Sequence, residues 1–443
     1  MLENTKYPST NFPRRKMRKL SQFLIPFTAI FHAFSTAWLE DWSAAQRPLL
    51  TSNETSCLTS YATRYDMVHG RNHVPIVTSD SADWPWEQPA ISPMNSTAGE
   101  QWEFDGVSED GTRAFIFGVY RDPNYAFLGT GNLRAYVEFV FDDGSRYAVV
   151  DYAEEAILTT CPGTGTRGVW RGPGFVYTFD VAEDMSTAQW AMESSEMNAT
   201  VVMKSLSRAR YPDNTMWHGN IQGNMAVLPH FFWAEPIPTA EVKVQVAVQS
   251  KMYSWTGVGG HERLWGAFNW RTCLRSLKIV RLQAGPFSLS LWEFGSGRDS
   301  NMTFSSAAMF ENGEKVFGVA GISRGNPTAE IEEVKEGEKS FTLRKLYGGE
   351  GITTEHLEDR VTGIEICLEQ PNQQLAWVFS VVFKKVGFEY VLTEGRGGTG
   401  YSGIVTGGRI EDSSAQEWAG PAFVEIMRLP DGDWWLLPDN YFE

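Results

Sequence analysis

The feature that most constrains the fold is a recurring alternation of apolar and polar residues with a period of two. It runs through Ala114–Tyr120, Leu133–Phe141 and Arg146–Asp151, and Asp142–Ser145 has the composition of a hairpin turn. Successive side chains of a strand point to opposite faces, so this period indicates strands rather than helices. The same pattern predicts strands at Gly174–Asp180, Ala199–Leu206, Glu241–Gln249, Leu277–Gln283, Phe287–Phe294, Phe341–Leu346, Leu375–Lys384 and Phe423–Arg428.

Helical windows are few, and Arg271–Arg281 can be read as either a helix or a strand. Many short strands separated by Gly, Pro and Asp turns are typical of sandwiches and barrels. A chain of 443 residues, 42% of them hydrophobic, can bury two cores. We therefore predict an all-β protein with two β-domains, 99–256 and 257–443. The glycine-rich segment Gly257–Gly260 is the expected hinge, although a loop inside the second domain would leave the same pattern.

The first 37 residues differ in composition from the rest of the chain. Five basic residues between Arg14 and Lys19 precede the apolar stretch Phe23–Phe34 and the small residues Ser35–Ala37. This order predicts a secretory leader over residues 1–37. An uncleaved membrane anchor is the lesser reading, because the stretch is shorter than the roughly 18 residues of a spanning helix. Residues 38–98, rich in Ser, Thr, Pro and Asn, are expected to form an extended N-terminal arm.

Passage through the secretory pathway is also favoured by four glycosylation sequons. Their acceptors are Asn53, Asn95, Asn198 and Asn301. The four cysteines have no CxxC spacing, which excludes a zinc ribbon. They allow three different two-bridge connectivities, or they remain buried thiols: Cys57, Cys161, Cys273 and Cys367.

Charge excludes two classes of partner. With 38 basic and 54 acidic residues the net charge is −16, which argues against nucleic acid as a partner. Residues 1–37 hold six basic and one acidic residue, so their removal leaves 32 − 53 = −21. An anionic membrane surface would repel this body, and no stable membrane contact is expected after leader removal.

The common signatures of cofactor and metal chemistry are missing. The sequence has no GxSxG, no HExxH, no Walker A and no GxGxxG between a strand and a helix. His69 and His73 are four residues apart, but Gly70 and Pro75 make a stable ligand-bearing helix a poor prediction there. We expect neither a metal site nor a cofactor.

Three segments combine aromatic and polar residues: Trp102–Gly106, Gly223–Pro236 and Gly259–Trp270. Rings interleaved with hydrogen-bonding groups are typical of a pocket for a largely apolar ligand with a carbonyl or amide head. A purely structural reading is open as well. Asp105 or Glu262 can cap a turn, and His261 can be a satisfied core histidine.

In this order and spacing, the chain resembles the fungal Diels-Alderase family, relatives of the hydroxyneurosporene-synthase-like double-lipocalin proteins. The resemblance is carried by Trp102–Asp110, Pro236–Val244, Gly260–Trp265, Gly285–Leu289 and Gly420–Glu425. It implies two lipocalin-like β-barrel or sandwich domains with a pocket mainly between them. It also implies cofactor-free cyclisation of a polyketide or polyketide-amino-acid polyene, alongside pathway enzymes such as a polyketide synthase.

We therefore expect an intramolecular [4+2] cycloaddition in which the protein folds a polyene for reaction. The expected polarising groups are His261, Asn269 and Arg263, and the expected substrate contacts are Trp102, Asp105, Trp233, Glu262, Trp265 and Trp270. Two alternatives remain open. One is an alkene hydratase or other acid-base cyclase in which His261 and Glu262 protonate an alkene, and the other is a lipocalin-type carrier of an apolar metabolite.

Overall fold

The computed structural model is built almost entirely from strands, which confirms the all-β prediction. A short 3-10 helix, Pro371–Gln373, precedes β21. No helix in that part is both long and apolar enough to cross a membrane. The described residues are 57–66, 76–78, 84–94, 98–122, 132–217, 223–248, 250–266, 273–299, 302–324, 331–391, 395–411, 414–415 and 417–429.

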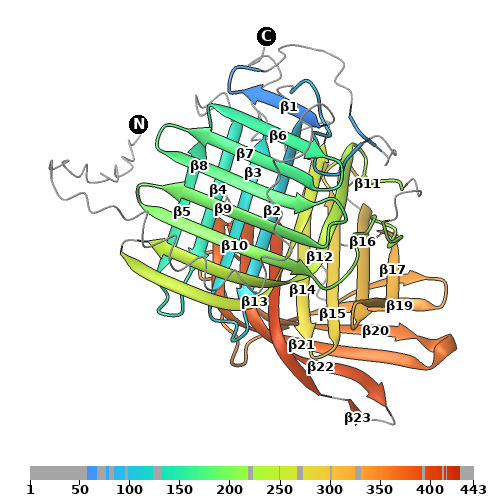
Figure 1. Cartoon of the computed structure of the whole chain (residues 1–443). Helices are drawn as coiled ribbons and strands as arrows, with labels where there is room; N and C mark the ends of the chain where they lie inside the picture. Colours follow the sequence, from blue (N-terminus) through green and yellow to red (C-terminus); the bar gives the residue numbers. More distant parts are fainter. Residues whose placement is uncertain are drawn as a thin grey trace, which may run out of the picture. The chain divides into compact units, whose positions relative to one another are not determined.

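The first sheet has 13 antiparallel strands in the order β1-β6-β7-β8-β9-β10-β12-β13-β2-β3-β4-β5, with β11 paired to β12 (Figure 1). It folds back on itself, because buried side chains of β2–β4 and of β6–β10 share one apolar core. The strands are β1 Leu58–Thr63, β2 Gly99–Ser108, β3 Ala114–Arg121, β4 Leu133–Val140, β5 Arg146–Tyr152, β6 Glu155–Cys161, β7 Gly165–Gly172, β8 Phe175–Ala182, β9 Thr187–Ser194, β10 Met197–Ser205, β11 Ala226–Leu228, β12 Phe231–Val248 and β13 Lys251–Gly266.

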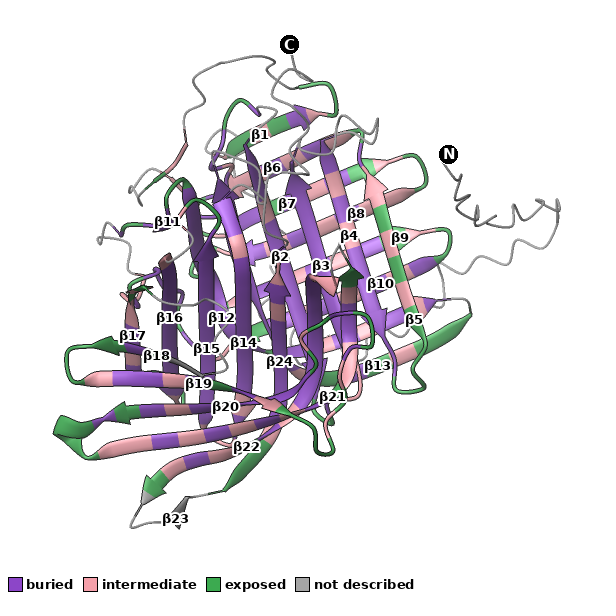
Figure 2. Cartoon of the chain, turned by 180° about the vertical axis from the view of Figure 1, so that it is seen from behind, coloured by how far each residue is buried: buried purple, intermediate pink, exposed green. Residues whose placement is uncertain are grey.

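The second sheet has 11 strands in the order β17-β16-β15-β14-β24-β22-β21-β20-β19-β18, with β23 paired to β22. It curves around a second apolar core, to which nearly all of its long strands contribute (Figure 2). The strands are β14 Leu274–Ala284, β15 Phe287–Ser296, β16 Met302–Glu311, β17 Glu314–Arg324, β18 Ile331–Glu336, β19 Lys339–Tyr347, β20 Val361–Gln370, β21 Leu375–Val391, β22 Gly397–Glu411, β23 Ser414–Ala415 and β24 Trp418–Arg428.

The period-two pattern located the strands well. The expected hairpin turn joins β4 to β5, and Gly144 supplies the positive φ of 80° that the turn needs. The ambiguous window Arg271–Arg281 is a strand where it is described, because β14 is paired on both sides, with β15 and with β24.

The prediction of a hinge at Gly257–Gly260 is wrong. Gly257–Gly260 is inside β13, where it pairs with β2 residues Asp105–Ser108, so these glycines do not form a connection between domains. A Cβ at Gly257 or Gly259 would overlap the backbone of β2, which explains the glycines as close-approach positions in a strand. The chain passes from the first sheet to the second between Gly266 and Leu274.

The described parts of the N-terminal arm are packed against the first sheet. Strand β1 pairs with β6, and the segment 84–94 contacts side chains of β2 and β13. Arg263 donates to the carbonyl oxygens of Trp86 and Gln88, and the Trp102 indole donates to the carbonyl of Glu87 at 3.1 Å. The Glu87 and Gln88 side chains are themselves buried. This segment is therefore buried against the first sheet, where Trp86, Ala90 and Ile91 join an apolar cluster with Trp265.

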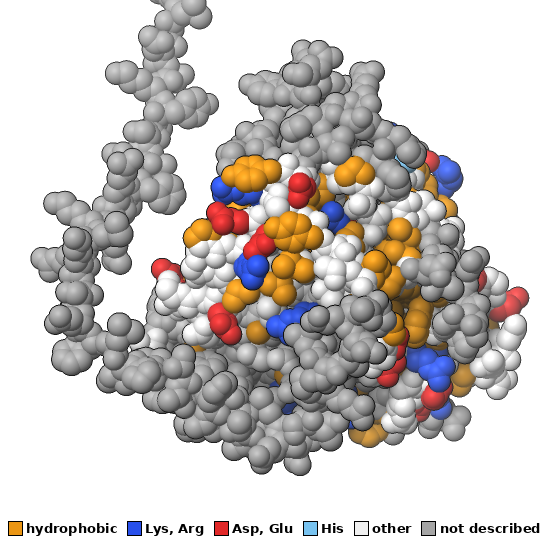
Figure 3. Space-filling view, turned by 45° about the horizontal axis from the view of Figure 1, so that its top comes forward, with side chains coloured by type: hydrophobic (Ala, Val, Ile, Leu, Met, Phe, Trp, Pro, Cys, Tyr) orange, Lys and Arg blue, Asp and Glu red, His pale blue; other side chains and the backbone are white. Residues whose placement is uncertain are grey.

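Apolar side chains also reach the surface singly. Tyr61, Tyr65 and Met252 are exposed. On the face drawn in Figure 3, apolar side chains lie in small groups between acidic and basic ones. Scattered exposure of this kind is normal for a soluble surface and needs no partner to explain it.

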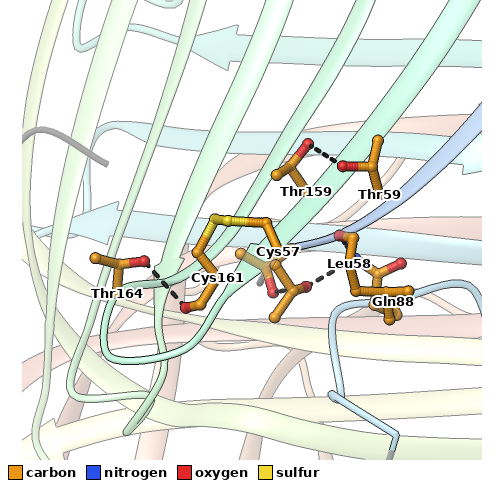
Figure 4. Close-up of a disulfide and its surroundings, with 9 residues drawn as sticks. Cys57, Leu58, Thr59, Gln88, Thr159, Cys161 and Thr164 are labelled. Atoms are coloured by element: carbon orange, nitrogen blue, oxygen red, sulfur yellow. Dashed lines mark hydrogen bonds between the residues drawn. A yellow bond between two sulfur atoms is a disulfide. The ribbon is translucent and has the colours of Figure 1, made fainter. Parts of the chain in front are cut away.

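A disulfide attaches the arm to the sheet. Cys57 precedes β1 and Cys161 ends β6, and the two are bonded across this strand pair, next to the hydrogen bond between Thr59 and Thr159 (Figure 4). Cys273 and Cys367 form no disulfide with each other or with the bonded pair. The sequence allowed either two disulfides among the four cysteines or four buried thiols, and the structure has one disulfide.

Replacing Cys57 with Ser should lower the free energy of unfolding by about 2 to 4 kcal/mol, because the bridge closes a long loop. The bonded cysteines are 104 residues apart in sequence. Urea unfolding without reductant measures the effect, with Cys367→Ser as the control that leaves the bridge intact. Equal midpoints for Cys57→Ser and the parent protein would contradict this bridge.

Candidate functional site

The two sheets pack against each other through a third apolar cluster. The first sheet contributes Trp233 of β12 and Leu264 of β13, and the second contributes Trp292 and Phe294 of β15. The ring centroids of Trp233 and Trp292 are 5.2 Å apart. Charged side chains lie within this interface, and their placement follows from strand pairing.

Strands β2 and β13 are paired in continuous register, with Glu262 opposite Glu103 and Gly260 opposite Asp105. Residues directly opposite each other share one face of the sheet, so these acidic side chains project together toward the second sheet. The arrangement places like charges side by side in a buried interface, and a cation is needed to stabilise it.

Arg281 of β14 supplies that cation from the second sheet. Its guanidinium donates to Asp105, to Glu262 at 2.6 Å and to Glu235 at 3.3 Å. A fourth bond runs to the carbonyl of Pro238 at 3.0 Å. Burial lowers the pKa of Arg281 to about 9, so it still carries its charge at neutral pH.

A Cβ at position 260 would overlap the Arg281 guanidinium. The absence of a side chain at Gly260, which pairs with Asp105, therefore leaves the space that the Arg281 side chain occupies. Its role at this position is steric, and it is what allows a long charged side chain to cross from one sheet to the other.

Glu235 joins a second arginine to the same network. Arg210 donates to Glu235 at 2.5 Å, and the Ser290 hydroxyl and Trp292 indole also donate to it, at 2.6 and 2.8 Å. Glu235 is fully buried and has a donor for each of its oxygens. It therefore reads as a structural carboxylate that connects β12 to β15.

Glu262 has a different environment. Burial raises its pKa well above the usual 4.5, and the neighbouring Glu103, Glu235 and Glu425 raise it further. The pKa of Glu103 is also raised by burial, against the opposing effect of a hydrogen bond from Tyr120 at 3.1 Å. The pKa of Glu425 is raised well above its usual value, again mainly by burial. The network thus favours neutral carboxyl groups more than solvent does.

Two buried oxygen atoms of this cluster have no hydrogen-bond partner among the described residues: Glu262 Oε1 and Asp105 Oδ1. A buried polar atom without a partner is costly and is often satisfied by a ligand. Both atoms belong to residues held by Arg281 between the sheets. We take this interface as the candidate functional site.

Strand alternation divides the residues expected from the sequence into two groups. Asp105, Glu262 and Trp233 lie at the interface between the sheets. His261, Arg263 and Trp265 alternate with Glu262 and Leu264 along β13 and lie on its other face, as their contacts below show.

His261 is a buried histidine whose ring nitrogens are both engaged. Its Nδ1 lies 2.8 Å from the carbonyl oxygen of Glu103, and its Nε2 lies 3.1 Å from the Glu87 carboxylate. Its ring stacks on Phe104 with centroids 3.9 Å apart. This side chain presents no free atom toward Glu262.

The remaining expected residues on that face fill cores or hold the arm. The Arg263 guanidinium lies 4.0 Å from the centroid of the Trp102 ring and pairs with Glu100 at 3.2 Å. Trp102 packs on Trp170 inside the first core, and Trp265 packs on Phe232 in the cluster beneath the arm. Their placement assigns them to the support of β13.

Several predicted positions lie outside the described residues. They are Asn269, Trp270, Asn53, Asn95 and Asn301. Asn198 is described, lies in β10 and is half-buried. Among the described residues, no group of three or more His, Cys, Asp or Glu side chains is arranged to hold a metal ion.

Four further residues complete the network and were not predicted from the sequence: Glu103, Glu235, Arg281 and Glu425. For Arg281 a signal existed in the sequence. Arg281 stands in the apolar strand Leu277–Gln283, and a charged residue in a buried strand is rarely present without a partner.

The model of the Diels-Alderase-like family matches residues 54–430. The chain belongs to that family. It is 40% identical over 412 residues to Diels-Alderase ffsF of Aspergillus flavipes, covering 93% of this chain and 95% of the relative. It is 39% identical over 425 residues to Diels-Alderase cheD of Chaetomium globosum, covering 95% and 96%.

A solved structure supports the fold of this Diels-Alderase-like protein. The crystal structure of CghA matches with a TM-score of 0.68 at 21% identity and covers 84% of this chain and 99% of that chain. The structure of CghA with Sch210972 matches with a TM-score of 0.67 at 20% identity, over the same shares of the two chains. The two-sheet architecture is thus shared with CghA.

Substituting Glu262 with Gln should make the stability of this Diels-Alderase-like protein less dependent on pH. The folded pKa of Glu262 lies above its unfolded value, so its contribution is complete at low pH and is lost as pH rises through the folded pKa. The parent protein should lose stability above about pH 4.5, and Glu262→Gln should lose less. The midpoints of urea unfolding, measured at several pH values from about 4.5 upward, give the dependence of stability on pH for each protein.

The matched control is Glu338→Gln, because Glu338 is exposed. Its stability profile should follow that of the parent. Parallel profiles for Glu262→Gln and the parent protein would show that Glu262 does not titrate in this way.

Proposed function

We propose that the protein catalyses an intramolecular [4+2] cycloaddition of a polyene held between its two sheets. The observation that carries the proposal is the unpartnered Glu262 Oε1 in a buried carboxyl cluster beside Trp233 and Trp292. Membership of the Diels-Alderase-like family supports it. The proposed substrate is a polyketide or polyketide-amino-acid chain with a tetramic-acid or pyrrolinone head, supplied by a polyketide synthase of the same pathway.

The reaction requires little covalent chemistry from the protein. The diene and the dienophile belong to one molecule, two σ bonds form as three π bonds become one, and no atom is gained or lost. Holding the chain in a near-attack conformation can lower the barrier by roughly 7 to 11 kcal/mol. Rigid rings such as Trp233 and Trp292 are suited to selecting one folded conformation.

Glu262 can supply polarisation in addition to shape. In its neutral form it accepts the hydrogen bond from Arg281 at Oε2 and can donate from Oε1. A donor on the carbonyl conjugated to the dienophile withdraws electron density and is worth about 3 kcal/mol in comparable sites. We assign this role to Glu262 rather than to His261, whose ring nitrogens are both engaged.

Two substitutions at this position separate the cycloaddition from the hydratase alternative. Glu262→Leu removes the donor and should slow the cycloaddition by about 100-fold, with the stereochemical ratio of products largely unchanged. Glu262→Gln retains an N–H donor and should keep the rate within about tenfold of the parent. Single-turnover kinetics with a linear polyene, with product ratios by chromatography, measure both.

A hydratase predicts the opposite result for Glu262→Gln, because an amide cannot transfer the proton to an alkene. Loss of all turnover in Glu262→Gln, with its melting temperature unchanged, would contradict the cycloaddition proposal. Product mass separates the remaining cases. A mass-neutral product supports the cycloaddition, a gain of water indicates a hydratase, and unchanged bound ligand indicates a carrier.

We further propose that the chain enters the secretory pathway and that its mature form begins near Trp38. The leader pattern over residues 1–37 supports this, and so does the Cys57–Cys161 bridge, because disulfides persist in oxidising compartments. Asn198 lies on the half-exposed face of β10, which alternates with the core residues Met197 and Ala199. A glycan can project from this position without entering the core.

Expression in a eukaryotic secretory host should therefore give a glycan on Asn198. Peptide mapping before and after enzymatic deglycosylation is the measurement. On a denaturing gel, deglycosylation should shift the Asn198→Gln variant less than the parent, by the amount that one glycan contributes. Intact protein that starts at Met1 and carries no glycan would contradict this route.

A further inference from the structure

A buried carboxyl of the second sheet also faces the interface between the sheets. Glu425 of β24 alternates with Val424 and Ile426, and it shares its face of the strand with Phe423 and Met427, which pack in the cluster between the sheets. Its side chain therefore points toward the first sheet, as theirs do. Glu425 is only 5% exposed, and it makes no hydrogen bond or ion pair with the described residues.

The neighbours of Glu425 within its own sheet offer it no hydrogen-bonding side chain. It pairs with Ile279 of β14 on one side and with Gly400 of β22 on the other. A Cβ at position 400 would overlap the Phe388 ring, so an aromatic side chain occupies the space beside Gly400. On the second sheet, the carboxyl group is thus flanked by apolar groups.

Across the interface, Glu425 faces other acids. Strand β24 contacts both β2 and β13. Burial raises the pKa of Glu425 well above its usual value, the charge of Glu103 raises it further, and Arg281 opposes them. Glu425 in turn raises the pKa of Glu262. The neutral form of Glu425 is favoured, and it carries an O–H donor for which the described residues provide no acceptor.

Two carboxyl groups of opposite sheets therefore have hydrogen-bonding capacity that the described residues leave unused. One is Glu262, through its fully buried Oε1, and the other is Glu425. A buried donor without an acceptor is costly, and a carbonyl oxygen of a ligand would satisfy it. The two donors differ in strength. Glu262 is bonded to the Arg281 cation at Oε2, which polarises its remaining O–H, whereas among the described residues no cation is bonded to Glu425.

We propose that Glu425 contacts the substrate and donates a hydrogen bond to a carbonyl oxygen of its head, from the second sheet and opposite Glu262. This inference rests on the proposed function and deepens it. Glu262, beside its cation, polarises the carbonyl conjugated to the dienophile, and Glu425 holds a second oxygen of the same head. The bond from Glu425 forms in the bound substrate and persists as the ring closes, so it contributes to affinity rather than to the rate of the bound substrate.

Glu425→Met tests the contact, because it keeps the length of the side chain, removes the donor and suits the apolar neighbours. Isothermal titration calorimetry of the full chain with hexanoyl tetramic acid, whose saturated chain has no diene, measures binding without cycloaddition. Glu425→Met should bind this ligand about tenfold more weakly than the parent, which is 1.4 kcal/mol. Glu425→Gln retains an N–H donor and should stay within about threefold of the parent.

Two further measurements separate this contact from a structural role. With a linear polyene that carries the same head, Glu425→Met should raise KM and leave kcat nearly unchanged, whereas Glu262→Leu lowers the rate. Urea unfolding without ligand should give a higher midpoint for Glu425→Met than for the parent, because an unpartnered buried carboxyl has been removed. A carboxyl that held the two sheets together would give a lower midpoint.

The matched control is Glu369→Met, because Glu369 is exposed on the outer face of β20 in the same sheet. It should bind hexanoyl tetramic acid like the parent. No saturable binding by the parent, unchanged affinity in Glu425→Met, or a lowered urea midpoint in that variant would each overturn the assignment of Glu425. Failure of the proposed function has a different result: the parent then binds the ligand through Glu425 and gives no mass-neutral product from the polyene.

Discussion

The interaction on which the rest of the structure depends is the set of bonds from Arg281 to carboxylates of the first sheet. It connects β14 with β2, β12 and β13, and the Arg281 guanidinium lies 5.4 Å from the centroid of the Trp292 ring in the apolar interface. Charges removed from water cost several kcal/mol each, and they are tolerated when each has a partner. The carboxyl groups outnumber the two arginines Arg281 and Arg210 here, which leaves proton binding as the remaining way to reduce repulsion. The electrostatic network that joins the sheets thereby also raises the pKa of the carboxyl groups buried within it.

Strand β13 serves two cores with its two faces. His261, Arg263 and Trp265 hold the first core and the N-terminal segment, while Glu262 and Leu264 face the second sheet. The support on one face fixes the position of the carboxyl group on the other. Because of this division, only Glu262 of this part of β13 takes part in the proposed chemistry. Its neighbours His261, Arg263 and Trp265 have structural roles.

Much of the fold could be predicted from the sequence, because alternation is a local property that strand formation enforces. The sites were harder. The residues Asp105, Glu262 and Trp233 were found because they stand among aromatic residues, but their neighbours His261 and Trp102 have the same composition and face the other way. Glu103, Glu235, Arg281 and Glu425 form a group only through pairing between distant strands, which composition does not encode. The hinge was misplaced for the same kind of reason, since glycines that permit close strand packing and glycines that permit a turn look alike in a sequence.

Gly260 and Arg281 have a consequence for how this enzyme can change. Any side chain at position 260 displaces the guanidinium, and loss of the guanidinium leaves Asp105 and Glu262 without their cation. The two positions are therefore coupled sterically, although 20 intervening positions separate them in the chain. A side chain introduced at position 260 thus requires a shorter side chain at position 281, and the carboxyl groups of the first sheet would then need a different cation.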